Sequence, residues 1–298
     1  RGRTPVLRVL NYTVPPEYDG RKLLHFLRGG AGCSYSLVRS LKTCPGGILR
    51  NGQQVRTIDR VHTGDQIKIT LHDTPKPLEQ CSLPVAILYE DDDLIVYNKP
   101  SGMACHPVRN LQQGTLANVF AHHCAEQGIA QTCHILNRLD RDTTGAVLIA
   151  RNAFAAAALT GRVEKCYIAV ASGTPDPVSG IIDLPIGQSD RSDPHRMVLP
   201  DGQRAVTEYT VIARGEGCSV VRCRLQTGRT HQIRVHLSQI GCPLLGDLLY
   251  GGPQEWIVRQ ALHCASLSFA HPVGGNPLVV DAPFPQDMQN LLDRCEKS

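Results

Sequence analysis

Closely spaced cysteine pairs are missing from this chain of 298 residues, although it contains 12 cysteines. No CxxC motif occurs, and the nearest two cysteines in the sequence are Cys218 and Cys223. Structural zinc sites use cysteine or histidine pairs at short spacings. We therefore predict that the protein has no metal site. Because an export signal is also missing, we expect reduced thiols, as in the cytoplasm, rather than a disulfide scaffold.

Long hydrophobic runs are missing as well. No apolar run approaches the ~18 residues of a membrane-spanning helix, and residues 1–12 lack the apolar stretch of a signal peptide. We therefore expect a cytoplasmic protein without a membrane partner. Hydrophobic residues form 42% of the chain and charged residues 19%, which excludes a disordered chain. The length favours two domains of roughly 150 residues, or one large domain.

Positive charge is unevenly distributed along the chain. Residues 1–72 contain 12 lysines and arginines against 4 acidic residues, a net charge of +8, and the remainder contains 19 against 23, a net charge of −4. The formal net charge of +4 therefore conceals a basic N-terminal segment on a nearly neutral body. Such a segment indicates a polyanionic partner, for example a nucleic acid.

The basic segment, residues 1–72, has the pattern of a small αβ domain. A helix is predicted to begin at Asp19, and a second helix is predicted to begin with Ser34 or Ser36 as its N-cap. An Asn-Gly pair at 51–52 predicts a β-hairpin, because both residues accept the left-handed conformation of its turn. We expect this domain to fold separately from the rest of the chain.

Residues 73–83 contain prolines and few apolar residues, so we place a linker there. Residues 84–298 then form the second domain. Predicted strands predominate in it and often follow one another directly, which favours an α+β fold with a mixed, largely antiparallel sheet. Two of its predicted helices begin at preferred N-cap residues, Thr115 and Thr230.

The densest polar loop, NRLDRDTTG, covers residues 137–145 and lies between two predicted strands. Asp140 stands between Arg138 and Arg141, and nearby positive charge favours the ionised carboxylate. An ionised carboxylate can act as a nucleophile at an anomeric carbon. On the residues alone, a surface turn whose aspartate and arginine side chains pair with one another is the more common structure.

Two further stretches carry candidate site residues. In QTGRTHQIRVH, His231 and Arg234 share a helical face at i,i+3 spacing, and Arg229 stands at the helix entrance. A helix N-terminus with arginines can bind phosphate or carboxylate, and a solvated basic face is the alternative. Tyr167, in the predicted strand KCYIAV, is either a core residue or a ring that stacks on a base.

The segments NRLDRDTTG, KCYIAV and TGRTHQIRVHL resemble, in this order, the three motifs of the RluA-type pseudouridine synthases. The segments VYNKPSGMACHP, GTLANVFAHH, GCPLLGDLLYG and ALHCASLSFAHP resemble further parts of the family, so the resemblance extends over residues 84–285. Residues 1–72 resemble, more loosely, the S-four-type RNA-binding domain that commonly precedes this catalytic domain. The resemblance implies the pseudouridine synthase fold and an enzyme that isomerises uridine to pseudouridine in RNA.

The resemblance also implies a role for each candidate residue. Asp140 matches the catalytic aspartate, and Arg234 matches the basic residue that pairs with it. Tyr167 matches the active-site tyrosine, which packs on the uracil and is a candidate for the proton transfer. Arg138 matches the residue that helps displace the target base and fills its place in the RNA.

Arg229 and His231 belong to the third motif, where the resemblance implies RNA or base binding, and Leu237 or its neighbours are expected to line the uracil pocket. Ribosomal RNA is the implied partner, with transfer RNA as an alternative, and we expect a monomer. Isomerisation needs no cofactor, and no Gly-rich phosphate loop occurs. Two positions depart from the family, which usually has His at Asn137 and Ser at Thr144; we expect an adjusted loop geometry there.

Two other functions compete with the isomerase hypothesis. A non-catalytic RNA-binding or ribosome-assembly factor on the same fold would not need Asp140, Tyr167 and Arg234 together. A glycoside hydrolase would need two facing carboxylates. Asp142 offers a second carboxylate in the same loop, but the family motif gives it no such role.

Overall fold

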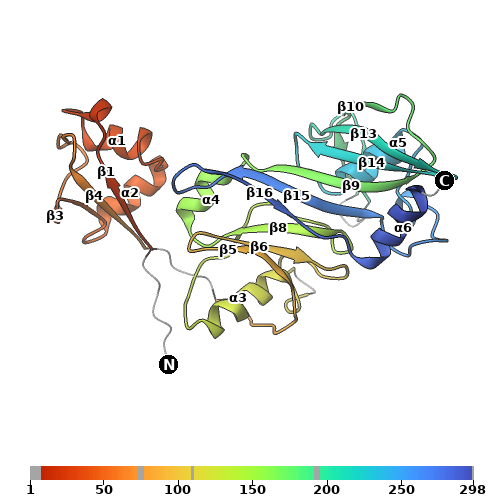
Figure 1. Cartoon of the computed structure of the whole chain (residues 1–298), viewed down its shortest axis with the longest axis horizontal. Coiled ribbons are helices and arrows are strands. Elements are labelled where there is room, and N and C mark those ends of the chain that lie inside the picture. The colour runs from red at the N-terminus through yellow and green to blue at the C-terminus, as the bar shows by residue number, and fades with distance from the viewer. Residues whose placement is uncertain (1–7, 73–76, 109–110, 191–194, 297–298) are drawn as a thin grey trace.

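The computed structural model describes residues 8–72, 77–108, 111–190 and 195–296. The first seven residues of the predicted N-terminal domain and the first four of the predicted linker lie outside the described residues. The described chain forms two main β-sheets, each with its own buried core. The smaller sheet lies at one end of an elongated molecule, and the larger sheet forms its body (Figure 1). In these ranges, every helix is too short or too polar to cross a membrane.

The N-terminal unit consists of β1 (Arg8–Thr13), η1 (Pro16–Tyr18), α1 (Leu23–Gly29), α2 (Tyr35–Thr43), β2 (Ile48–Arg50), β3 (Gln53–Gln54) and β4 (Gln66–Leu71). Its sheet has the strand order β1-β4-β2-β3. Leu23, Phe26 and Leu27 are buried because their spacing places them on one face of α1. The predicted hairpin is confirmed between β2 and β3, where Asn51 and Gly52 have φ angles of 50° and 81°.

The first two predicted helix starts had different outcomes. The Ser34 cap is confirmed, because its hydroxyl accepts a hydrogen bond from the backbone N–H of Leu37 at 3.1 Å. The predicted start at Asp19 is wrong, and α1 begins at Leu23. Asp19 instead follows η1, and its carboxylate accepts a hydrogen bond from the backbone N–H of Thr63 at 2.8 Å.

The strands of the main body sheet are β5 (Ile87–Glu90), β6 (Leu94–Lys99), β7 (His134–Ile135), β8 (Thr144–Ala150), β9 (Glu164–Ser172), β10 (Ser179–Asp183), β13 (Val206–Gly215), β14 (Cys218–Leu225), β15 (Leu262–Ala270) and β16 (Pro277–Asp281). The order is β10-β13-β14-β9-β15-β8-β6-β5, with β16 beside β15 and β7 beside β8. Among the described residues only β8 and β15 pair in parallel. A separate small sheet joins β11 (Ile186–Gly187) and β12 (Met197–Val198). The predicted α+β fold with a mixed, largely antiparallel sheet is confirmed.

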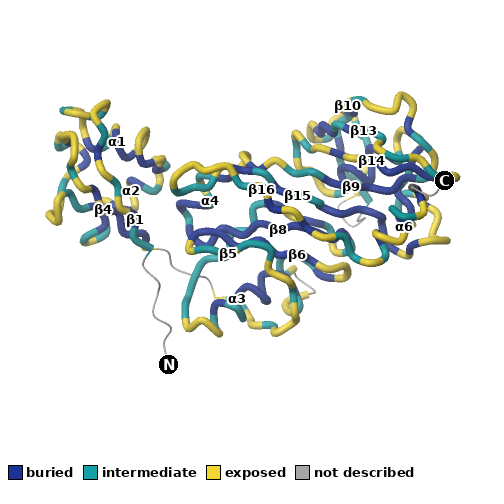
Figure 2. Tube along the Cα trace, in the orientation of Figure 1, coloured by how far each residue is buried: buried dark blue, intermediate teal, exposed yellow. Residues whose placement is uncertain are grey.

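The body helices are α3 (Leu116–Glu126), α4 (Ala153–Leu159), α5 (Gln232–Gln239), η2 (Leu248–Tyr250) and α6 (Gln286–Glu296). All seven residues of β8 are buried, and the central strands are the most deeply covered part of the body (Figure 2). The Thr115 cap of α3 is confirmed as a capping box with Asn118. The predicted Thr230 cap of α5 is wrong, because the residue before α5 is His231 in the left-handed conformation.

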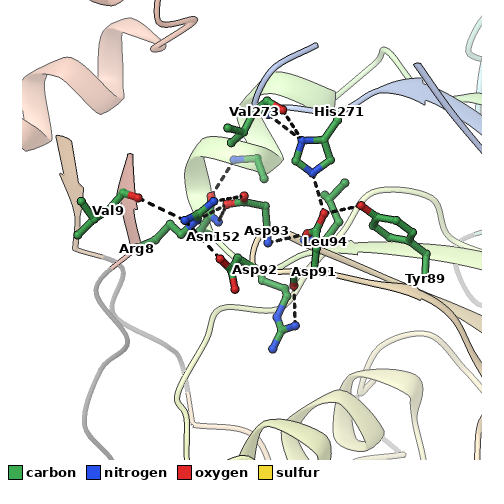
Figure 3. Close-up of polar contacts among 12 residues, drawn as sticks. Arg8, Val9, Tyr89, Asp91, Asp92, Asp93, Leu94, Asn152, His271 and Val273 are labelled. Carbon is green, nitrogen blue, oxygen red and sulfur yellow. Dashed lines mark hydrogen bonds and ion pairs between the residues drawn. The ribbon is translucent and has the colours of Figure 1, made fainter. Parts of the chain in front are cut away.

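The N-terminal unit contacts the body at the turn before β6. Arg8 on β1 donates two hydrogen bonds to the Asp93 carboxylate, at 2.9 and 2.7 Å, and Asn152 donates a third at 2.8 Å (Figure 3). The bond to Asp93 raises the pKa of Arg8. Phe154 of α4 is buried in the N-terminal core, and Val273 packs against the same core. The contact between the two units therefore combines a partly buried ion pair with a buried aromatic side chain.

Candidate active site

A pocket of about 450 Å³ opens in the body between the loop after β7, strand β9 and the turn that leads into α5. Its volume lies within the roughly 300–1,000 Å³ that small-ligand sites occupy. All three sequence motifs contribute to its lining, with Arg138 and Asp140 from the first, Tyr167 from the second and residues 228–234 from the third. The fold therefore brings the candidate residues together around one cavity.

Asp140 lies in the loop between β7 and β8, and its side chain is 24% exposed. Arg234, in the first turn of α5, donates from Nη1 to Asp140 Oδ2 at 3.1 Å. The two residues are far apart in the sequence, so only the fold creates this pair. The pocket lining therefore contains an ion pair between a carboxylate and a guanidinium, an arrangement that is frequent at functional sites.

Arg234 is held from behind by Asp247, which is buried. Arg234 donates from Nε to Asp247 Oδ2 at 2.7 Å and from Nη2 to Oδ1 at 2.8 Å, and its guanidinium lies 5.0 Å from the ring centroid of Tyr250. Burial opposes the charge of Arg234, but the hydrogen bonds and charges of Asp247 and Asp140 outweigh burial and raise its pKa. Arg234 is thus a charged side chain of fixed orientation.

His231 precedes α5 and has φ 58° and ψ 18°. Residues other than glycine adopt this left-handed backbone conformation only under strain. Its Nδ1 lies 2.8 Å from the Tyr250 hydroxyl, and its Nε2 lies 3.9 Å from Asp140 Oδ2. Burial lowers the pKa of His231; the Asp140 carboxylate opposes this effect, and the Arg234 charge adds to it. The imidazole is therefore neutral at pH 7 and faces Asp140 without a second positive charge.

Tyr167 lies on β9, where it belongs to the main core and also lines the pocket. Burial raises the pKa of Tyr167 well above its usual value, so the phenol keeps its proton. Lys165, two residues earlier on the same face of the strand, also lines the pocket. Burial lowers the pKa of Lys165.

Arg138 and Arg229 are exposed residues on the pocket lining. Arg229 donates from Nε to the carbonyl oxygen of Arg204 at 3.0 Å. Leu237 differs from the sequence expectation: it is completely buried in the main core and is not among the described residues around the pocket. Its neighbour Ile233 supplies apolar lining there instead.

The backbone of the Asp140 loop is held by a buried lysine. Lys99 is completely buried at the end of β6, and its Nζ donates to the carbonyl oxygens of Pro100, Met103 and Arg141 at 2.8, 2.8 and 2.9 Å. Burial lowers the pKa of Lys99 to about 8. The bond to Arg141 fixes the peptide unit between Arg141 and Asp142, one residue beyond Asp140.

Asp142 has a structural role in the same loop. Its Oδ1 accepts hydrogen bonds from the backbone N–H of Gly102 at 3.1 Å and from the Ser101 hydroxyl at 3.4 Å. Asp142 is not among the described residues that line the pocket. The geometry therefore gives no support to a glycoside hydrolase in which Asp140 and Asp142 act as facing carboxylates.

The two positions that depart from the family motif are buried and hydrogen-bonded. Asn137 donates from its amide to the carbonyl oxygen of Ala146 at 2.9 Å and accepts from the backbone N–H of Leu148 at 2.8 Å. The Thr144 hydroxyl lies 2.8 Å from Nδ1 of His263. Both side chains thus attach the loop to the sheet.

Sequence reasoning missed Asp247 and Tyr250 as members of the site. Both lie in GCPLLGDLLYG, a segment that entered the family resemblance without a residue being singled out. A buried aspartate directly after a glycine carries no local signal of its partner. A search for acidic residues near the arginines of the third motif would have suggested Asp247 as an ion-pair partner for Arg234.

Among the described residues, Asp91, Asp93 and His271 bring three potential metal-ligand atoms within 4.8 Å of one another. These side chains are already bonded: Asp93 accepts from Arg8 and Asn152, and Asp91 Oδ2 lies 2.8 Å from Nε2 of His271 (Figure 3). The cluster therefore joins parts of the chain and offers no open ligand set.

Comparison with known proteins identifies the family. A sequence model described as RNA pseudouridylate synthase matches residues 93–239. The uncharacterized RNA pseudouridine synthase YjbO of Bacillus subtilis is 39% identical over 276 residues, which cover 89% of this chain and 96% of that protein. The ribosomal large subunit pseudouridine synthase D of Zymomonas mobilis is 38% identical over 241 residues, which cover 73% and 75%.

A solved structure, the human RNA pseudouridylate synthase domain containing 4, superimposes with a TM-score of 0.58 at 27% identity. The match covers 70% of this chain and 92% of the human chain. The sheet that carries the pocket therefore has the pseudouridine synthase fold. On the extent of the similarity to YjbO and the family match around Asp140 and Arg234, this chain belongs to the RNA pseudouridylate synthase family.

Proposed function

We propose that this protein isomerises uridine to pseudouridine in structured RNA, with ribosomal RNA as the substrate and Asp140 as the catalytic residue. The observation that carries the proposal is the pair of Asp140 with Arg234, at 3.1 Å, on the wall of a pocket that Tyr167 also lines. The name of the Zymomonas mobilis relative supports ribosomal RNA of the large subunit as the substrate. Transfer RNA is the alternative substrate.

The reaction breaks the N-glycosidic bond of uridine, turns the uracil and joins it to the ribose through carbon. In the proposed mechanism, Asp140 acts on the ribose, as nucleophile or as a stabiliser of positive charge at the anomeric carbon. Arg234 keeps the carboxylate oriented, because Asp247 fixes the other side of its guanidinium. Tyr167 packs against the uracil, and its protonated phenol can donate a proton to the nitrogen released from the ribose. The resulting phenolate can then accept the proton that the carbon loses when the new bond forms, which returns Tyr167 to its starting state.

The target base must leave its stack to reach a pocket of this kind, at a cost of a few kcal/mol. We assign the displacement of the base to Arg138, which is exposed on the pocket lining and free to fill the vacated place. Arg229 and His231 would contact the RNA or the base at the entrance of α5. The high cost of opening a duplex favours a uridine in a loop or bulge.

Residues 1–72 are proposed to form an RNA-binding domain of the S-four type, joined to the body through a linker at 73–83. Its net charge of +8 supports phosphate contacts that do not depend on sequence. A non-catalytic RNA-binding factor remains the competing function. It is disfavoured because a binder has no use for a carboxylate presented to the pocket by a buried arginine.

The test combines a map of pseudouridines with an aspartate variant. Total RNA from cells without the protein is incubated with the purified chain, and the modified positions are mapped. The wild-type chain is expected to modify defined uridines in ribosomal RNA, and Asp140→Ala is expected to modify none while its RNA affinity changes less than about threefold. Asp183→Ala, at an exposed surface pair with Arg204, is the matched control.

Each outcome of this test separates the hypotheses. Modification by Asp140→Ala at the normal rate would show that another residue is catalytic. Binding of RNA without modification by the wild-type chain would favour the non-catalytic factor. Modification of transfer RNA alone would keep the reaction and replace the substrate.

A further inference from the structure

A second buried cation, Arg259, also holds the Asp140 loop. Arg259 donates from Nη1 to the carbonyl oxygen of Asp142 at 3.1 Å, two residues after Asp140. The same nitrogen lies 3.2 Å from the carbonyl oxygen of Gln260. Lys99 holds the carbonyl of Arg141, so consecutive peptide units are gripped by cations from two distant segments.

The loop is also fixed by the residues that follow Arg259. Gln260 donates from its amide to the Thr143 hydroxyl at 3.2 Å, and His263 bonds the Thr144 hydroxyl at 2.8 Å. Side chains from 259–263 therefore contact three consecutive loop residues, from 142 to 144. Any displacement of Arg259 would move the first of these contacts, the one nearest Asp140.

The orientation of Arg259 depends on a carboxylate from the last helix. Arg259 donates from Nε to Asp287 Oδ2 at 2.7 Å and from Nη2 to Asp287 Oδ1 at 2.9 Å. The Arg259 side chain is 7% exposed, and a guanidinium buried to that extent requires a paired carboxylate. The fork of two parallel bonds fixes the plane of the guanidinium and directs Nη1 at the loop.

Helix α6 is in turn a fixed support for Asp287. Met288, Leu291 and Cys295 are buried on one face of α6, in a cluster with Val220 of β14. Their spacing covers two turns of the helix, so that α6 is anchored along its length rather than at one point. Asp287 precedes the first anchor, Met288, by one residue and moves with it.

We propose that Arg259 and Asp287 are positioning residues that hold Asp140 at its catalytic distance from the ribose. The chain of contacts runs from α6 through Asp287 and Arg259 to the carbonyl of Asp142, and from there along two residues of backbone to Asp140. The inference rests on the proposed function, because it names what sets the position of the proposed catalytic residue. Neither positioning residue lines the pocket among the described residues, so neither touches the substrate.

The test compares two aspartate-to-asparagine changes on the same helix. Asp287→Asn removes the charge that holds Arg259. Asp293→Asn makes the same chemical change at a residue whose carboxylate accepts an exposed bond from Gln289 at 2.8 Å. Both are measured on unmodified large-subunit ribosomal RNA transcribed in vitro, well below the melting temperature of each variant. The single-turnover rate at saturating RNA and the Kd for RNA are determined separately.

The rate of Asp287→Asn is expected to fall about 10- to 100-fold, because a misplacement of about 1 Å can reduce a rate a hundredfold. Its Kd is expected to change less than twofold, since the RNA-contacting residues are untouched. Hydrogen exchange of the backbone amides of residues 141–144, measured without RNA, should become faster. Asp287→Glu restores the charge and should recover most of the rate, and Asp293→Asn should match the wild type in every measurement.

Equal rates and equal hydrogen exchange in Asp287→Asn and Asp293→Asn would overturn the proposal. A loss of rate that Asp287→Glu does not recover, with unchanged exchange in 141–144, would also overturn it. If Asp287→Asn does not fold, Arg259→Lys provides the same test, because lysine keeps the charge but lacks the planar fork that bonds both carboxylate oxygens and directs another nitrogen at the carbonyl. An inactive wild-type chain would refute the proposed function, whereas the exchange experiment would still test the support of the loop.

Discussion

Arg234 bonds two carboxylates at once, and this double contact decides the electrostatics of the pocket. Two nitrogens of the Arg234 guanidinium donate to the buried Asp247 carboxylate, and the third donates to Asp140. Because one guanidinium serves both carboxylates, a change at Asp247 is transmitted to Asp140 without any contact between them. A residue behind the pocket therefore controls the orientation of the proposed catalytic carboxylate.

We predict that Asp247→Asn reduces the single-turnover rate about tenfold or more, because Arg234 loses one arm of its fork and the orientation of Asp140 relaxes. The free energy of unfolding should fall by about 3 kcal/mol, since a buried guanidinium is left with less charge compensation. Urea unfolding and single-turnover kinetics measure the two effects. Asp183→Asn, at an exposed pair, should change the unfolding free energy by less than about 0.5 kcal/mol.

Burial of Lys99 makes the free energy of unfolding depend on pH, and the direction of this dependence follows from the lowered pKa of Lys99. The pKa of its ammonium is about 8 in the folded chain, against 10.5 ordinarily. Between these values the unfolded chain binds more protons at this lysine, so its contribution to the free energy of unfolding rises with pH. The rise amounts to at most about 3 kcal/mol.

Lys99→Met isolates this contribution. The variant should be less stable than the wild type at pH 7, because the carbonyl oxygens that Lys99 bonds lose their donor. The difference in unfolding free energy between wild type and variant should widen from pH 8 to pH 10.5. A constant or shrinking difference, measured by urea unfolding at several pH values, would contradict the assigned pKa.

At the scale of elements, the parallel pairing of β8 with β15 depends on one glycine. Gly145 has φ +113°, and a Cβ there would lie 2.3 Å from the carbonyl oxygen of Cys264. We predict that Gly145→Ala lowers the free energy of unfolding by more than about 3 kcal/mol, because the strands must separate. Gly128→Ala, with φ +71° and open space around it, should cost about 1 kcal/mol. Similar losses for both variants in urea unfolding would show that close approach is not the cause.

Local signals predicted some elements of the fold and missed others for identifiable reasons. Ser34 and Thr115 cap their helices because each hydroxyl lies within reach of the N–H three residues later. The same argument wrongly predicted Thr230 as an N-cap. At this helix start, the side chain of Gln232, the first residue of α5, accepts a hydrogen bond from the backbone N–H of Arg229 at 2.9 Å. A competing side chain within the helix is invisible to a rule based on the cap residue.

The candidate site was predictable where motifs carry it and not where tertiary contacts build it. Asp140, Tyr167 and Arg234 follow from motif order, and the structure gathers them around one pocket. Asp247 could not be ranked above other aspartates, because its partner is chosen by the turn after α5. Leu237 was expected at the uracil pocket but lies in the core, because the periodicity of a helix does not show which part of the fold packs against each of its faces.

At the scale of the whole molecule, charge is divided unevenly between the two units, with a net charge of +8 on residues 1–72 and −4 on the remainder. We predict that deleting residues 1–72 lowers RNA affinity and flattens its dependence on salt, because phosphate contacts release counterions. The deletion also exposes Phe154, so a variant of the full chain is needed beside it. Arg39→Gln with Lys42→Gln, both exposed on α2, should reduce the salt slope by about two if each contacts a phosphate.

Arg214→Gln with Arg224→Gln removes the same charge from exposed positions on the body and provides the control. The slope is obtained from RNA affinities measured at several salt concentrations. If the body variant and the α2 variant lose the same slope, the N-terminal unit has no special part in RNA binding. An unchanged slope after deletion of residues 1–72 would lead to the same conclusion.

Strand β6 separates the attachment point of the N-terminal unit from the Asp140 loop. It begins beside Asp93, to which Arg8 attaches the N-terminal unit, and it ends at Lys99, which holds the Asp140 loop. Its six residues span about 20 Å, at about 3.3 Å per residue, and β8 pairs with it from end to end. An RNA held by both units must bridge at least this length, so an oligonucleotide that carries only the target uridine and its nearest neighbours can engage one unit and never both.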